Sequence, residues 1–142
     1  MTRWHAFFAT SFAVLLLAGC PTQSGTTLDD ADTVEIGVGS SFAGAERSGD
    51  VVGATEFNAT CQGFFPVAAQ HELTIDEPLN MRIEVSGSAN AVVRVEADGV
   101  GTFCGDADEP LSRFWNRATL NVFVGSTVEG EQFSYELRFI EN

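Results

Sequence analysis

The chain has 142 residues, which is enough for one domain and too few for two. It carries 20 Asp and Glu against 7 basic residues, all of them arginine, and its net charge is −13. A surface this acidic repels phosphate, so we expect no nucleic-acid partner and no direct adsorption to anionic lipid headgroups.

The first nineteen residues have the pattern of a targeting segment. Arg3 and His5 form a short positive start, and residues 6–18 are an almost unbroken apolar run. A run of this length fits the core of a signal peptide, whereas a transmembrane helix needs about 20 residues. We therefore predict that residues 1–19 are a signal peptide.

The apolar run ends in Leu17-Ala18-Gly19-Cys20, which resembles the bacterial lipobox. This resemblance implies cleavage before Cys20 and attachment of a diacylglyceryl group, with fatty chains such as palmitate, to its thiol. One chain gives only marginal membrane binding, whereas two or three hold a protein on the bilayer. Pro21 follows the cysteine where an aspartate favours the inner membrane, so we expect an outer-membrane lipoprotein of a Gram-negative envelope. The alternative is an ordinary secretory signal with an accidental cysteine.

Residues 20–33 are polar, contain three aspartates and lack apolar periodicity. We interpret them as the lipidated cysteine followed by a flexible acidic tether, which leaves residues 34–142 for the folded domain. The stretch that follows the tether is rich in Gly, Ser and Ala, and it allows a first strand near Val34–Val38.

Further along the chain, apolar and polar residues alternate with a period of two, which is typical of half-buried strands. Turn residues such as Asp76-Glu77-Pro78 and Asp98-Gly99 separate these segments. No stretch of the mature chain shows a convincing amphipathic helix. The pattern predicts an all-β fold, an antiparallel β-sandwich or jelly-roll-like single domain. The expected strands cover residues 71–75, 79–86, 91–97, 119–124 and 133–139.

Lipidation of Cys20 leaves two cysteines, Cys61 and Cys104, which form a disulfide if the compartment is oxidising. Closing a loop of this size stabilises a fold by about 4 kcal/mol in the chain-entropy model. The alternative is two separate buried thiols. Two cysteines and the single mature histidine, His71, are too few for a zinc site.

Several short motifs after residue 50 resemble the β-sandwiches related to the pre-peptidase C-terminal domain, which envelope and secreted proteins of some Gram-negative bacteria carry. The resemblance implies that the two cysteines occupy equivalent places and that the domain can accompany an exported enzyme. Phe123 stands where that family often has Trp, and Cys104-Gly105-Asp106 lacks its adjacent pair of aspartates. The motifs are Cys61-x-Gly63-Phe64, the strand of residues 70–75, Asp98-Gly99, Cys104-x-Asp106, Val122-Phe123-Val124-Gly125 and Tyr135-x-Leu137.

Asp106, Asp108 and Glu109 place three carboxylates within four residues, and such oxygens are the ligands that calcium prefers. We consider them as a calcium site; no other cofactor is expected. Arg117 takes the twelfth position where an EF-hand loop has its bidentate glutamate, so the alternative is a solvated turn beside the disulfide. His71 lacks a nucleophile motif near it, and we interpret it as structural rather than as a general base.

Four aromatic residues are candidate binding rings because they fall in expected loops or face away from a valine row. Such rings can stack on sugars or anchor a protein partner. The alternative is that they close the ends of the core. The four residues are Phe64, Phe65, Trp115 and Phe123.

Three functions follow from these patterns. We favour a non-catalytic, membrane-anchored binding or structural module of unknown ligand, with an envelope protein or polysaccharide as partner. A second hypothesis is an accessory module that acts with a secreted enzyme. The third, with least support, is a hydrolase that uses two carboxylates such as Asp106 and Glu109.

Overall fold

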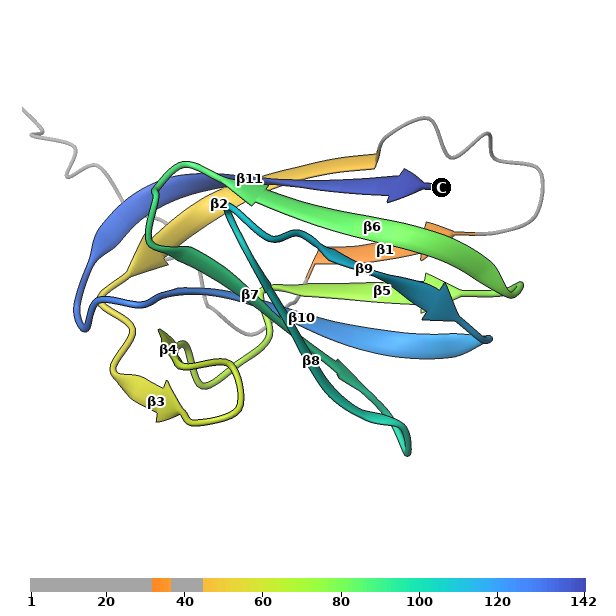
Figure 1. The fold of residues 1–142 in the computed structure, drawn as a ribbon, viewed down its shortest axis with the longest axis horizontal. Helices are drawn as coiled ribbons and strands as arrows, with labels where there is room; N and C mark the ends of the chain where they lie inside the picture. Colours follow the sequence, from red (N-terminus) through yellow and green to blue (C-terminus); the bar gives the residue numbers. More distant parts are fainter. Residues whose placement is uncertain (1–31, 37–44) are drawn as a thin grey trace, which may run out of the picture.

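The described residues, 32–36 and 45–142 of a computed structural model, form eleven β-strands and no helix (Figure 1). Within them, nothing matches the length and apolar character of a membrane-spanning helix. The predicted signal peptide and Cys20 lie outside this part of the chain. The strands are β1 (Asp32–Ile36), β2 (Ala45–Val52), β3 (Glu56–Asn58), β4 (Gly63–Phe65), β5 (His71–Ile75), β6 (Leu79–Ser86), β7 (Ala91–Ala97), β8 (Gly101–Asp106), β9 (Leu111–Trp115), β10 (Ala118–Ser126) and β11 (Gln132–Glu141).

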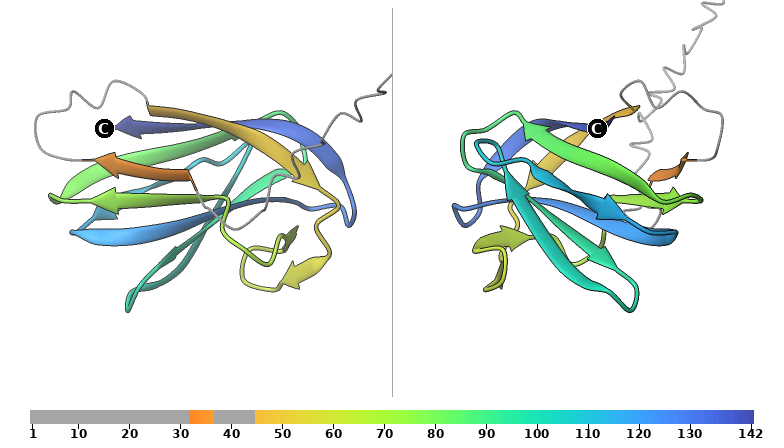
Figure 2. Two further views of the ribbon diagram at one scale, coloured as in Figure 1. Left: turned by 180° about the vertical axis from the view of Figure 1, so that it is seen from behind. Right: turned by 45° about the vertical axis from the view of Figure 1, so that its right-hand side comes forward.

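The strands pack as two sheets, which confirms the predicted all-β sandwich (Figure 2). One sheet has the order β2-β11-β6-β9, and all its pairs are antiparallel. The other is built around β10, which pairs with β5 and β4 along one edge and with β7 along the other, while β8 extends the sheet beyond β7. The parallel pair β1–β5 departs from the antiparallel expectation.

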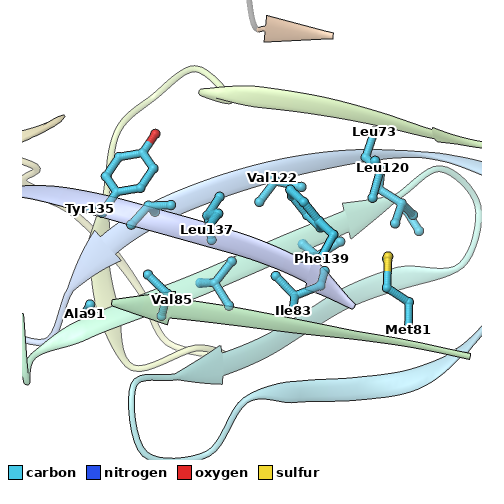
Figure 3. Packing of buried hydrophobic residues seen from close by; sticks show 14 of the residues in the cluster. Leu73, Met81, Ile83, Val85, Ala91, Leu120, Val122, Tyr135, Leu137 and Phe139 are labelled. Carbon is cyan, nitrogen blue, oxygen red and sulfur yellow. The ribbon is translucent and has the colours of Figure 1, made fainter. Parts of the chain in front are cut away.

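The core lies between the sheets and follows from alternation along the strands. Residues at every second position of β5, β6, β7, β10 and β11 point inward, and each such row is buried. A fully buried side chain of this size contributes about 1.5–3 kcal/mol through the hydrophobic effect. Figure 3 shows part of this core, with Leu73, Met81, Ile83, Leu120, Val122, Leu137 and Phe139 among its members.

The structure also contains strands that the alternation did not predict. The first strand spans Asp32–Ile36 and so begins before the expected Val34. β2, β3, β4, β8 and β9 occupy segments for which we expected no strand or a loop. These strands are short or carry glycine and charged residues at inward positions, so period-two apolar patterning is weak in them.

Candidate functional site

A small second core covers the outer face of the β10-centred sheet. Cys61, Phe65, Val92 and Phe123 are buried together there, separate from the main core. The predicted disulfide is present: Cys61 and Cys104 are joined with an S–S distance of 2.02 Å. It ties the β3–β4 hairpin to β8, so this cover is fixed covalently to the sheet.

A buried arginine completes this cover. The guanidinium carbon of Arg94 lies 3.9 Å from the ring centroid of Phe123 and 4.8 Å from that of Phe65. Its Nε is 3.2 Å from the carboxylate of Glu96. Only 8% of Arg94 is exposed, so the aromatic faces and the carboxylate take the place of water around its charge. Arg94 is therefore a structural cation, closed off from solvent.

Three of the four candidate aromatic rings are buried, which fits the alternative that they close the core. Phe65, Trp115 and Phe123 are 0%, 2% and 6% exposed. Phe65 and Phe123 belong to the outer cover, and the Trp115 ring packs edge-on against Phe103 at 5.4 Å in the main core. Phe64 is half-buried, and its ring lies 5.2 Å from that of Phe57, which is 60% exposed. The accessible ring of this pair is thus Phe57, which lies in no alternating apolar row of the sequence.

The acidic turn after β8 is organised by its own first carboxylate. Oδ1 of Asp106 accepts hydrogen bonds from the backbone N–H groups of Asp108 and Glu109, at 2.9 and 2.6 Å. This is an Asx-type turn, in which the side chain satisfies local backbone donors. In the described ranges, no group of three or more His, Cys, Asp or Glu side chains is arranged to hold a metal ion. The three carboxylates are therefore not brought together, and calcium binding remains a prediction.

A hollow of about 390 Å³ opens beside this turn and the disulfide. Its walls include Val92, Pro110 and Leu111, while Asp106 and Glu109 supply carboxylates. Polar surface predominates in this lining, and its carboxylates beside Pro110 and Leu111 suit a side chain that ends in a positive charge.

His71 is 4% exposed, and its Nε2 shares a 2.7 Å hydrogen bond with the hydroxyl of Tyr135. Tyr135 is also buried, and burial together with the charge of Asp50 raises its pKa to about 12. The pair joins β5 of one sheet to β11 of the other across the core, so its role is structural, as the sequence suggested for His71.

Glu131 joins two turns at one end of the sandwich. Its carboxylate accepts hydrogen bonds from Ser126, from Ser88 at 3.0 Å and from Asn90 at 3.2 Å. The hydrogen bond from Ser126, followed by those from Asn90 and Ser88, lowers the pKa of Glu131 despite partial desolvation. The β10–β11 turn and the β6–β7 turn are therefore held in one fixed arrangement.

Further hydrogen bonds extend this arrangement to neighbouring loops. The N–H of Thr127 donates to the carbonyl of Asn90, that of Gly130 donates to Ala54, and that of Ala107 donates to Ala91. These bonds gather four loops, 53–55, 87–90, 107–110 and 127–131, which we call the loop end. Figure 1 shows the ends of β2 and β6 and the β10–β11 turn on the same side of the molecule, away from the C-terminus.

The loop end combines exposed apolar residues with negative charge. Val52, which precedes loop 53–55, is 75% exposed, and Val128 is 49% exposed. Phe57 lies close by, because β4 pairs with β10 at Ser126 and β3 pairs with β4. Loops 107–110 and 127–131 contribute four carboxylates, and none of the four loops contains a basic residue. The loop end is the candidate binding surface.

Two solved structures share this fold. One is PliG of Aeromonas hydrophila, a periplasmic lysozyme inhibitor of g-type lysozyme, with a TM-score of 0.52 at 16% identity over 78% of this chain and 96% of that chain. Another is PliG of Salmonella Typhimurium, also a periplasmic lysozyme inhibitor of g-type lysozyme, with a TM-score of 0.51 at 10% identity over 80% of this chain and 100% of that chain. At these identities the likeness establishes the fold alone.

No family model matches the chain, and no curated protein matches its sequence. The resemblance to pre-peptidase C-terminal domains accordingly stays a prediction.

Proposed function

We propose that this chain is a lipid-anchored envelope protein whose sandwich binds a lysozyme and inhibits it. The observation that carries the proposal is the match to two periplasmic lysozyme inhibitors over nearly their whole length, 96% and 100%. The whole of the inhibitor fold therefore has a counterpart in this sandwich. This proposal makes specific the expected binding module that acts with a secreted enzyme.

The placement of the titratable groups supports a non-catalytic role. His71 is buried and hydrogen-bonded to Tyr135, so it does not face a substrate. Asp106 uses one carboxylate oxygen to cap its own turn, and Glu109 follows in that turn instead of facing it across a cleft. A glycosidase needs two carboxyl groups on opposite sides of the scissile bond. This arrangement disfavours the carboxylate-hydrolase alternative.

The lipid anchor is part of the proposal and rests on the lipobox-like sequence ending at Cys20. Between Cys20 and Asp32, where β1 begins, the chain can span at most about 40 Å when fully extended. A lipidated Cys20 would therefore keep the sandwich close to the membrane, where a lysozyme that attacks the cell wall has to pass.

A lysis assay tests the inhibition. Purified g-type lysozyme is assayed on a peptidoglycan suspension with increasing amounts of the detergent-solubilised lipoprotein, and c-type and i-type lysozymes are compared. We expect one class to be inhibited at a 1:1 ratio. An unrelated protein of equal negative charge, at the same ionic strength, controls for unspecific binding of a basic enzyme. Full activity of all three lysozymes in excess lipoprotein would contradict the proposal.

Intact-mass analysis of the protein from membranes tests the anchor separately. We expect a chain that begins at Cys20 and carries acyl groups, and we expect Cys20→Ser to abolish both processing and membrane attachment. A wild-type protein released without acyl chains would rule out the anchor and leave the inhibition untouched.

A further inference from the structure

We propose that the loop end is the surface that docks the enzyme, and that it binds a basic, partly apolar face from which a lysine or arginine enters the hollow beside Glu109. The identity of the partner as a lysozyme rests on the proposed function. The location of the surface and the charge of its partner come from the residues of this chain.

The apolar part of the argument is the exposure of Val52, Phe57 and Val128. A contact centred on an aromatic ring with aliphatic neighbours is the usual composition of an energetically important interface core. The Phe57 ring is supported by Phe64 behind it, and the disulfide holds the β3–β4 hairpin against the sheet. The ring is therefore presented on a rigid base, which reduces the entropy lost on binding.

The charges around these side chains decide what kind of partner fits. Glu56, Asp108, Glu109 and Glu129 are exposed at or beside the loop end. Arg82 and Arg138 lie on the β2-β11-β6-β9 sheet in ion pairs with Glu84 and Glu46, and Arg117 lies in the β9–β10 turn at the opposite end. Arg138 lines a hollow with Pro110 at the margin of the loop end. The four loops contain no basic residue that could neutralise their carboxylates. A basic protein surface is thus attracted to this end, whereas an acidic one is repelled.

The hollow provides a place for one side chain of that surface. The stem of a lysine or arginine can lie on Pro110 and Leu111, while its charged head reaches the carboxylate of Glu109. Glu109 is exposed, so pairing with it does not require burial of an unpaired charge. Val128 and the hollow's Glu109 belong to the hydrogen-bonded loops, and Val52 and Phe57 lie on the strands beside them, so a single partner face can engage both.

Two matched pairs of double variants test the proposal in the full lipoprotein, with g-type lysozyme as the probe and the inhibition constant as the readout. Val52→Ser with Phe57→Ser removes apolar contacts at the loop end, and Val100→Ser with Phe114→Ser removes a valine and a phenylalanine that are also exposed but lie elsewhere. Glu109→Gln with Glu129→Gln removes charge at the loop end, and Glu77→Gln with Asp98→Gln does so at the opposite end. Thermal unfolding of every variant verifies its fold.

We expect each loop-end variant to weaken inhibition by at least about tenfold, and each control by less than about twofold. The effect of the charge variant should shrink as salt is raised, because screening removes long-range attraction. The charge pair decides the result if Phe57→Ser unfolds the protein.

Three outcomes are distinguishable. Selective loss in the loop-end variants supports the docking surface. Unchanged inhibition by folded loop-end variants overturns it and leaves the lysozyme proposal standing. Failure of the wild-type protein to bind or inhibit the enzyme overturns both.

Discussion

At the residue scale, the hydroxyl of Tyr135 is buried between the sheets beside His71, in the cluster shown in Figure 3. Gly49 on β2 makes room for it, because a Cβ atom at Gly49 would lie 2.5 Å from the Tyr135 hydroxyl. We therefore expect any side chain at Gly49 to displace the Tyr135 ring and break the hydrogen bond to His71.

The raised pKa of Tyr135 predicts a loss of stability at alkaline pH. Its pKa is about 12 in the folded chain against an ordinary value of 10, so the unfolded chain loses this proton first. The contribution is fully present below pH 10 and disappears as the pH rises to about 12, by on the order of 2 kcal/mol. Because the sequence has one tyrosine, tyrosinate absorbance follows this group alone. A native titration midpoint near 10 would contradict the burial.

Trp115 and its neighbour Phe114 provide a matched test of core against surface. Trp115 is 2% exposed and Phe114 is 51% exposed, although they are adjacent on β9. We expect Trp115→Ala to lower the free energy of unfolding by about 3–5 kcal/mol, since it leaves a cavity in a packed core. Phe114→Ala should cost less than about 1 kcal/mol. Urea unfolding followed by circular dichroism measures both, and equal losses would refute the assignment.

At the element scale, Glu131 joins the turns that frame the loop end. Its pKa is lowered, so its contribution to stability is present above its ordinary value of 4.5 and is lost as the pH falls through the lower folded value. We predict that Glu131→Gln destabilises the protein at neutral pH and that the difference from wild type shrinks in acid. Glu129→Gln, in the same turn but exposed, is the control. Melting curves at several pH values measure the effect; a deficit that persists unchanged in acid would exclude this role of the carboxylate.

Whether a strand could be predicted from the sequence depended on the residues at its inward-facing positions. β6, β7, β10 and β11 carry apolar residues at those positions, and their alternation was legible in the sequence. The alternation of β2 was not legible, because its inward row includes Gly49, which has no side chain and leaves space for the Tyr135 ring. In β9 the inward Arg113 breaks the row, and its guanidinium stacks 3.5 Å from the Phe103 centroid, a contact that depends on the fold.

The candidate site was less predictable than the fold, because it also depends on contacts that form only in the folded chain. The disulfide could be inferred by counting cysteines, and the acidic turn could be located from its composition. The loop end could not, because Val52, Phe57, Glu109 and Val128 come from separate parts of the chain and meet only through the hydrogen bonds between turns. A single exposed valine or phenylalanine carries no signal in a sequence until its neighbours are known.

At the scale of the whole molecule, the negative charge acts on stability as well as on binding. Arg82, Arg94 and Arg138 form ion pairs with Glu46, Glu84 and Glu96, and the sequence has only 7 arginines for its 20 acidic residues. The remaining carboxylates repel one another in the folded chain more than in the expanded unfolded chain.

Modest salt should therefore stabilise the protein. The screening length shortens from about 30 Å at 0.01 M to about 10 Å at 0.1 M, which weakens repulsion across the surface more than it weakens the close ion pairs. We expect the melting temperature to rise on the order of 5 °C over this range of sodium chloride. Glu109→Gln with Glu129→Gln should raise the melting temperature at low salt and reduce its dependence on salt, because the two loops that carry these carboxylates contain no arginine. A melting temperature that falls with salt would mean that the ion pairs outweigh the repulsion, and it would contradict this prediction.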